Sequence, residues 1–328
     1  MPITNDYNIP LALAVWLLHD DYDYIDDPDY ISVTRLMRPI RHIILPPRIP
    51  PNTRTVDLSE FIARVSGNSF HDSIEKAWLN NPQAKLRSLG YPKEIIDRIR
   101  VNPSDAEVIN DPEIIPVYLE QRAIREFQGV RIGGKFDMVT EGIVNDTKST
   151  SAWGWVFGTR DDEHALQGSL YRWIDAGQPH PRITEDYMRV NYIFTDWQKS
   201  QARQNPKYPQ KRLEQKIIKL LPIKETEEFI LHKLAEIEKY RDTPEKQLPR
   251  CTDEELWRSE PKYKYFSDPE KAKDPAARST KNFDTIMEAN AHRANQGKGV
   301  VITIPGEVKR CGYCDAFDGC TQKDEYQL

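Results

Sequence analysis

Polar and apolar residues alternate through positions 132–148, and this period of two predicts two short strands joined by a tight turn that contains Gly142. Asp137 lies between apolar residues of the first strand, so its carboxylate is expected to point away from the apolar side. Asp146 and Lys148 are expected on one face of the second strand, because side chains repeat every second residue. The pattern predicts a place where two acids and a lysine meet; an ordinary surface salt bridge is the alternative.

The rest of the chain alternates between helical and extended patterns. A capping box at Asp57–Glu60 predicts the start of a helix that continues past His71. Acids from Asp161 onward, followed by apolar residues at helical spacing and a stop at Gly177, predict a second helix. Further strands are expected at 116–127 and 187–195, a helix at 224–240, and a charged segment with a helical pattern at 252–300.

The composition indicates that the chain can bury a hydrophobic core. Of its 328 residues 38% are hydrophobic and 30% are charged, so we expect one α/β domain with insertions, or one domain with a small appendage. The formal net charge of −5 means that an anionic partner needs a local basic patch. The apolar run at 11–18 is too short to span a bilayer and follows no signal-peptide pattern, so we expect a cytoplasmic protein with no membrane partner.

Several single polar residues are weaker indicators of a site. His71 and Glu75 are four residues apart and share one helical face, where a histidine is more often a satisfied polar residue than a ligand. Glu120, on the strand at 116–127, is a candidate for the same site, although a surface or structural role is favoured. Gln167 and Tyr171 are also four residues apart, on one face of the helix that begins at Asp161.

Two groups of cations are candidates for contact with phosphates. Arg35, Arg38 and Arg41 follow a Ser/Thr helix start at helical spacing, and a plain solvated face is the alternative. The segment 197–212 contains no acid, and cations and a tyrosine alternate with polar residues there: Lys199, Arg203, Lys207, Tyr208, Lys211 and Arg212. Such a mixture neutralises a nucleic-acid backbone and offers a ring for stacking. An exposed loop without a ligand is the alternative.

The chain has four cysteines, Cys251, Cys311, Cys314 and Cys320, and the last three have the spacing C-x2-C-x5-C. In a reducing compartment structural disulfides are not expected. Four thiolates are the number that a tetrahedral zinc ion or an iron–sulfur cluster requires, and spacing alone does not separate the two. Unbound buried cysteines are the alternative. A metal clip between Cys251 and the tail would close a long loop and stabilise the fold.

In this order, the motifs resemble those of the PD-(D/E)XK nuclease superfamily, in its RecB-like branch with the phage-type exonucleases. Gly134–Asp137 followed by Asp146–Lys148 resembles the D…(D/E)-x-K core, with aspartate in place of the commoner glutamate. Three segments resemble further motifs of the branch: S-x-[ST]-x-L at 32–36, G-x-x-x-H at 67–71 and Q-x-x-x-Y at 167–171. The terminal cysteines resemble the branch's iron–sulfur staple, although its first cysteine usually precedes the core and Cys251 follows it.

The resemblance implies an α/β fold with a restriction-endonuclease-like core, in which helices flank a mixed β-sheet, and with a C-terminal cysteine-stapled extension. The implied divisions are an N-terminal helical segment at 1–56 that packs on the core, a nuclease core at 57–240, and an extension at 241–328 that carries the four-cysteine site.

The resemblance also implies a site for Mg²⁺ or Mn²⁺. Carboxylates are the natural ligands of hard cations that clamp attacking and leaving oxygens, and Asp137 and Asp146 supply them, with the Thr147 carbonyl as a further ligand. His71 would complete the shell, and an imidazole there favours manganese. Lys148 would orient the attacking water or neutralise charge on the phosphate.

The remaining implied roles concern substrate and cluster. Gln167 and Tyr171 would hold the substrate backbone and support Lys148. The four cysteines would bind a [4Fe–4S] cluster, with Zn²⁺ as the alternative.

The function expected from these features is that of a Mg/Mn-dependent DNA exonuclease in phage or bacterial recombination, repair or replication. A processing endonuclease that trims flaps or CRISPR-type fragments, and a catalytically silent iron–sulfur DNA-binding protein, are the alternatives. DNA ends are the expected partner, together with a recombinase, single-strand-binding protein or helicase. A homo-oligomer is expected by analogy only.

Overall fold

The computed structural model describes residues 2–50, 55–157, 160–274 and 276–326, and its contacts divide the chain into two compact units. The first, which we call the core unit, consists of Met1–Arg38 and Arg54–Ala235. The second, the cysteine unit, consists of Pro39–Thr53 and Glu236–Leu328. An early segment of the chain therefore belongs to the same unit as the C-terminal residues. The three-part division at 56 and 240 stays a prediction.

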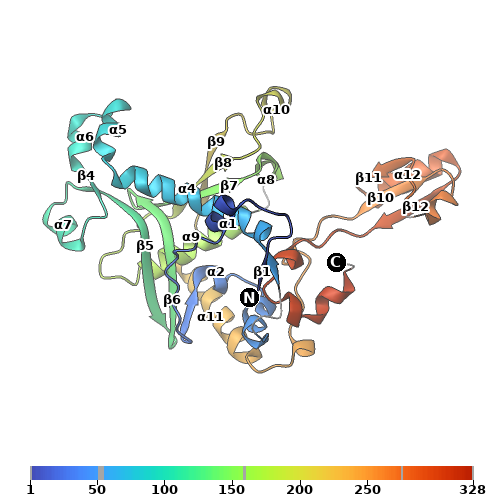
Figure 1. Ribbon diagram of the computed structural model, residues 1–328, viewed down its shortest axis with the longest axis horizontal. Coiled ribbons are helices and arrows are strands. Elements are labelled where there is room, and N and C mark those ends of the chain that lie inside the picture. The colour runs from blue at the N-terminus through green and yellow to red at the C-terminus, as the bar shows by residue number, and fades with distance from the viewer. Residues whose placement is uncertain (1, 51–54, 158–159, 275, 327–328) are drawn as a thin grey trace. The chain divides into compact units, whose positions relative to one another are not determined.

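A seven-stranded mixed sheet forms the centre of the core unit (Figure 1). Its main path runs β4-β5-β6-β7-β8-β9, and β2 pairs with β6 beside that path. The strands are β2 (Tyr30–Ser32), β4 (Ile99–Val101), β5 (Ile115–Phe127), β6 (Val130–Thr140), β7 (Ile143–Thr150), β8 (Tyr187–Phe194) and β9 (Leu213–Lys219). The pairs β2–β6, β4–β5 and β7–β8 are parallel, and the others are antiparallel. The mixed α/β fold with a sheet flanked by helices is thus confirmed.

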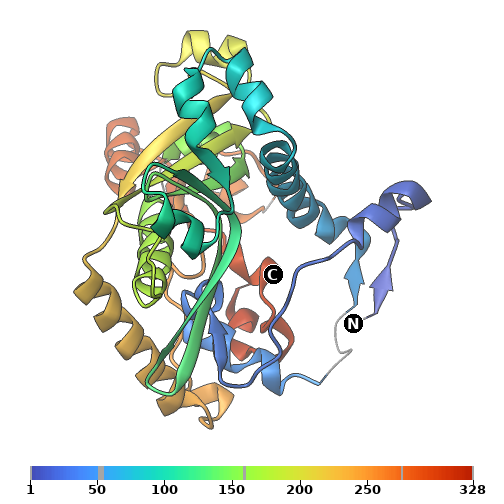
Figure 2. The same ribbon diagram turned by 90° about the vertical axis from the view of Figure 1, so that its left-hand side faces the viewer.

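Two long helices of the core unit position the residues discussed below. Helix α4 (Ile62–Leu79) follows the predicted capping box, in which Asp57 and Glu60 bond each other's backbone N–H groups. Helix α9 (Asp161–Asp175) contacts β5, β6, β8 and β9, and Figure 2 shows it alongside the long β5–β6 hairpin. Parallel strands need a crossover connection, and α8 (Ala152–Phe157) and α9 form the one between β7 and β8.

Short elements complete the core unit. They are β1 (Ile3–Thr4), α1 (Leu11–Leu17), α2 (Val33–Leu36), β3 (Val56–Asp57), the 3-10 turn at Leu58–Phe61, α5 (Pro82–Ser88), α6 (Lys93–Arg98), α7 (Asp105–Asn110) and α10 (Lys199–Gln204).

Close packing holds α9 against the sheet. Gly134 on β6 leaves room for the ring of Tyr171, since a Cβ at this glycine would lie 2.6 Å from Cε1 of the tyrosine. Gly168 has the same role toward β8, where a Cβ would lie 2.6 Å from the sulfur of Met188. Trp173 on α9 is fully buried. The Gln/Tyr motif helix is therefore fixed to the strands that carry the predicted acids.

The cysteine unit contains a small sheet of order β11-β10-β12 with α12 (Ile286–Gln296) beside it. The strands are β10 (Lys262–Phe266), β11 (Lys281–Phe283) and β12 (Val300–Ile304). The helical pattern expected throughout 252–300 is therefore wrong except at α12. The alternation of Lys and Tyr from Lys262 onward has the strand period of two, and β12 is rich in β-branched residues that favour strands.

Two further helices belong wholly or partly to the cysteine unit. They are α3 (Ile40–Ile44) and the last turn of α11 (Ile223–Tyr240). Short 3-10 turns lie at Pro46–Arg48, Glu245–Gln247, Lys271–Lys273, Arg310–Tyr313, Phe317–Gly319 and Thr321–Glu325. In the part of the chain that the structure describes, no helix is both long and apolar enough to cross a membrane.

Candidate active site and metal centre

Three carboxylates form a row across three neighbouring strands. The β5–β6 register places Glu120 opposite Asp137. The β6–β7 pairing ends where Met138 pairs with Asn145, and Asp146 follows on β7, where it pairs with Val190 of β8. Like charges directly opposite each other destabilise a sheet. Each acid has a cationic or titratable neighbour: Lys135 lies beside Glu120, His71 beside Asp137 and Lys148 beside Asp146.

The backbone of Glu120 is strained. Its φ of 50° lies in the left-handed region, although it is a non-glycine residue in the middle of a strand. The pairing of β5 with β6 is interrupted at this position. The side chain of Glu120 lies 3.1 Å from Nζ of Lys135. Strain of this kind persists where the surrounding structure enforces it, and it is concentrated at functional sites.

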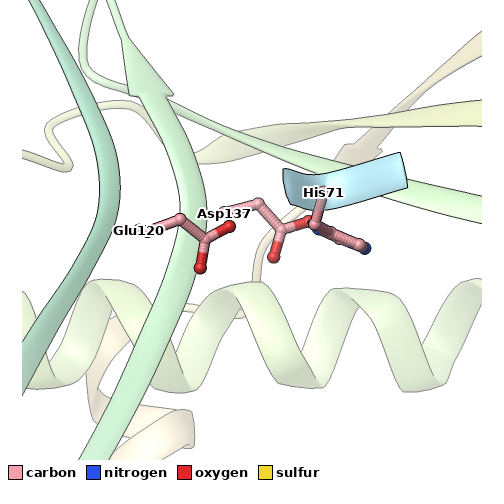
Figure 3. A group of neighbouring side chains, drawn as sticks. All are labelled: His71, Glu120 and Asp137. Atoms are coloured by element: carbon pink, nitrogen blue, oxygen red, sulfur yellow. The ribbon is translucent and has the colours of Figure 1, made fainter. Parts of the chain in front are cut away.

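Helix α4 contributes His71 to the row of acids (Figure 3). Its Nδ1 lies 3.2 Å from Oδ2 of Asp137, which also accepts a 2.9 Å hydrogen bond from the backbone N–H of Thr147. One ligand atom each of His71, Glu120 and Asp137 lies within 4.8 Å of the other two. Two carboxylates and an imidazole so close together suit a divalent cation such as Mg²⁺ or Mn²⁺.

Asp146 and Lys148 form a buried pair beside this group. Asp146 is 2% exposed, and its Oδ1 accepts a 3.0 Å hydrogen bond from Nζ of Lys148. Its Oδ2 lies 2.9 Å from the same Nζ and, among the described residues, accepts no hydrogen bond of good geometry. A buried carboxylate oxygen with unused acceptor capacity fits a cation ligand.

The surroundings shift the pKa values of the acids in opposite directions. Burial raises the pKa of Asp146 to about 6, and the charge of Asp137 adds to this while Lys148 opposes it. Burial and Asp137 also raise the pKa of Glu120 against the effect of Lys135. Burial acts to raise the pKa of Asp137 as well, but His71 and Lys148 outweigh it, so this pKa is lowered. Asp137 is therefore the acid most firmly held as a carboxylate.

A cleft of about 620 Å³ opens beside His71, Glu120 and Asp137, whereas Asp146 and Lys148 are not among the residues that line it. Polar groups at its wall include His71, Glu120, Asp137 and Thr147, together with Lys211 of the predicted basic segment. Apolar side chains also line it: Ile74, Trp78, Leu119, Met138, Ile193 and Leu213. The cleft thus combines a candidate cation-binding group with an apolar surface, as ligand pockets do.

Gln167 and Tyr171 are brought together as predicted, and Nε2 of Gln167 donates a 3.0 Å hydrogen bond to Oη of Tyr171. Tyr171 is buried, and its ring packs edge-on against Phe136 of β6. Neither residue of the pair is among those that line the cleft. The ring of Tyr171 therefore packs against β6, and the roles predicted for this pair stay predictions.

The predicted basic residues are only partly gathered at the site. Lys211 lines the cleft, and Lys199, Arg203, Lys207 and Arg212 are exposed. Tyr208 does not offer a stacking surface as expected, because it is 2% exposed. Its hydroxyl accepts a 3.1 Å hydrogen bond from the backbone N–H of Gln198, and its ring contacts that of Trp153. Arg35 is exposed and Arg38 half-buried in the core unit.

The four cysteines line one small pocket of about 20 Å³ in the cysteine unit. None of them forms a disulfide. Burial raises the pKa of Cys251 to about 12 and that of Cys314 to about 11. Arg41, His42 and Lys323 line the same pocket. Four thiolates are the number of ligands that a metal ion or an iron–sulfur cluster requires, but the group of ligand atoms within 4.8 Å of one another found among the described residues does not include these sulfurs. Such a group would displace the thiol protons on binding.

Sequence reasoning favoured a structural role for Glu120, and the structure places it among the candidate ligands. The sequence did contain one indication of this position. In the hairpin formed by β5 and β6, the residue opposite Asp137 is Glu120. Arg41 was expected on a basic face that contacts phosphates, but the structure places it against the sulfur of Cys320. No role was predicted for His42, which contacts the sulfur of Cys314. Their long sequence separation from the cysteines left no pattern to detect.

No family model matches the chain, and no curated protein matches it. Among solved structures, one similar chain is SSO0001, with 14% identity, a TM-score of 0.39, and coverage of 68% of this chain and 84% of that one. Another is a phage-related exonuclease from Haemophilus somnus 129PT, with 15% identity, a TM-score of 0.27, and coverage of 49% and 78%. At these scores neither likeness carries an inference about this chain.

Proposed function

We propose that the protein is a metal-dependent DNA nuclease, and specifically an exonuclease that hydrolyses phosphodiester bonds from DNA ends. The observation that carries the proposal is the convergence of His71, Glu120 and Asp137 within 4.8 Å. The buried Asp146 lies on the next strand, close enough for the charge of Asp137 to raise its pKa. Carboxylate oxygens and an imidazole nitrogen this close together are ligands that a divalent cation prefers.

A bound Mg²⁺ or Mn²⁺ would lower the pKa of a coordinated water and stabilise the charge that develops on the phosphate. We assign its ligands to His71, Glu120, Asp137 and Asp146, with the Thr147 carbonyl as a further candidate. The hydrogen bond from the Thr147 N–H fixes the Asp137 carboxylate in place. His71 approaches the same carboxylate with Nδ1, and this contact raises the pKa of the imidazole although burial opposes the change.

Lys148 is assigned to the reacting phosphate. Burial acts to lower its pKa, but Asp146 and Asp137 outweigh burial and raise it, so the ammonium stays charged near neutral pH. From its place beside Asp146 it can donate a hydrogen bond to the attacking water or to a phosphate oxygen. Gln167 and Tyr171 are assigned to hold the strands behind the acids.

The walls of the cleft suit a nucleic-acid strand. Lys211 supplies a cation for the backbone, and Trp78 supplies an apolar ring beside Ile74 for a base. For the four cysteines we propose a [4Fe–4S] cluster. Measurement of the iron and zinc contents of the purified protein distinguishes this cluster from a zinc site.

Substrate topology tests the proposal. Matched linear and circular DNA, single- and double-stranded and labelled at either end, is incubated with the metal-loaded protein and Mg²⁺ or Mn²⁺. We expect linear DNA to be degraded and circles to survive, with the label position giving the polarity. Nicking of circles would replace the exonuclease with a processing endonuclease. Binding without cleavage would refute the nuclease proposal.

A further inference from the structure

Two side chains of α3 approach the cysteine sulfurs. Nη1 of Arg41 donates a 3.2 Å hydrogen bond to Sγ of Cys320. Nε2 of His42 lies 3.2 Å from Sγ of Cys314. Both residues line the pocket that the four cysteines surround. The cysteines all come from the last third of the chain, whereas these two partners lie more than two hundred residues earlier.

Arg41 is held in place by a complete set of partners. It is 4% exposed. Its Nε donates to the carbonyl of Pro249 at 3.0 Å, and its Nη2 donates to the carbonyl of Glu245 at 3.1 Å. Its Nη1 also donates to the carboxylate of Glu245, which in turn accepts a 3.0 Å hydrogen bond from the backbone N–H of Thr321, next to Cys320. These hydrogen bonds hold the guanidinium of Arg41 beside the sulfur of Cys320.

We propose that Arg41, assisted by His42, is a positioning residue for the metal group proposed above at the four cysteines, and that this group thereby fixes the segment 39–50. Sulfur ligands of a metal group carry negative charge, and N–H donors to them stabilise its more reduced state. The segment leaves the core unit after Arg38 and returns to it at Arg54. Loss of the group would therefore loosen a part of the chain far in sequence from any cysteine.

Arg48 provides a matched control within the same segment. Its guanidinium donates to the carbonyls of Tyr240 and Thr243, at 3.1 and 2.6 Å, and to that of Arg241. Arg48→Gln and Arg41→Gln both remove a segment-anchoring guanidinium. Only Arg41 has a bond to a cysteine sulfur as well, so the two variants separate an effect on the metal group from general loosening.

The first test is spectroscopic. The full-length protein is loaded anaerobically with iron and sulfide, its iron and zinc contents are measured, and visible circular dichroism and the potential of one-electron reduction by dithionite are recorded. We expect Arg41→Gln to lower the reduction potential and change the dichroism, and Arg48→Gln to leave both at the parent's values. If zinc is the native metal, the charge-transfer band of the Co²⁺-substituted protein replaces these readouts. A parental spectrum in Arg41→Gln, or the absence of any bound metal, would overturn the proposal.

The second test measures hydrogen exchange of the α3 amides. Chelation of the metal is expected to speed their exchange at least tenfold in the parent and to have a smaller effect in Arg41→Gln, where they already exchange faster. Unchanged exchange on chelation would overturn the proposal. If Arg41→Gln does not fold, Arg41→Lys serves instead, because it keeps the charge but loses the multiple donors. The inference is independent of nuclease activity, since neither readout involves DNA.

Discussion

Replacement of Glu120 is expected to separate stability from function. A left-handed φ costs a residue with a Cβ about 1–2 kcal/mol, and Glu120 has such a φ of 50°. Glycine adopts this φ without that cost but loses about 0.5–1 kcal/mol through its extra freedom in the unfolded chain. Glu120→Gly and Glu120→Gln both remove the ion pair with Lys135 and the negative charge opposite Asp137. They differ in backbone strain, so the glycine variant should be more stable by about 0.5–1 kcal/mol.

Urea and thermal unfolding of the metal-free protein measure this difference. For a unit of this size about 1 kcal/mol corresponds to about 2–4 °C in Tm. Mn²⁺ titration by calorimetry is the second readout, and both variants are expected to bind at least about tenfold more weakly because one carboxylate ligand is absent. Equal stability of the two variants would refute the strain argument. Parental Mn²⁺ affinity in both would refute the assignment of Glu120 as a ligand.

Three further predictions concern packing, titration and the cysteine site. Gly134→Ala should destabilise the protein by about 1–3 kcal/mol in urea unfolding, since the new Cβ meets the Tyr171 ring at 2.6 Å. Gly67→Ala is the control: Gly67 lies within helix α4, and the nearest atom to a new Cβ there is 3.9 Å away, so this variant should be neutral or stabilising. Burial, with nearby cations, lowers the pKa of His164 to about 4. The unfolded chain therefore binds this proton first, and the contribution of His164 to the free energy of unfolding should fall by up to about 3 kcal/mol between pH 6.5 and pH 4. Thermal scans at stepped pH should show this fall as a difference in slope between the parent and His164→Gln. Cys251→Ser should lower the bound metal per chain in elemental analysis, and a full metal content in this variant would exclude Cys251 as a ligand.

The hairpin and its acids were predictable because they follow from local rules. A period of two gives strands, and two strands joined by a tight turn must be antiparallel neighbours. Asp137 and Asp146 therefore had to lie close together. The spacing of Gln167 and Tyr171 likewise predicted that they share one helical face, and the hydrogen bond between them agrees with that prediction.

What was missed depends on contacts between distant segments. Tyr208 looks exposed in a basic, polar sequence, but tertiary packing buries it against Trp153. The partners of the cysteines come from α3, and nothing in the local pattern around Arg41 predicts a contact with Cys320. The left-handed backbone of Glu120 also has no sequence signal, because glutamate does not favour it.

The most direct test of the central claim is the cleavage rate of end-labelled linear DNA as a function of Mn²⁺, compared between the parent, Asp137→Asn and Lys148→Ala. The control is Lys93→Ala, which removes an exposed lysine of the same unit that pairs with Asp97 on its own helix. The account predicts Mn²⁺-dependent cleavage by the parent and Lys93→Ala, with a loss of at least about a hundredfold in the two site variants. Cleavage at the parental rate in both site variants, or none by the metal-loaded parent, would contradict it.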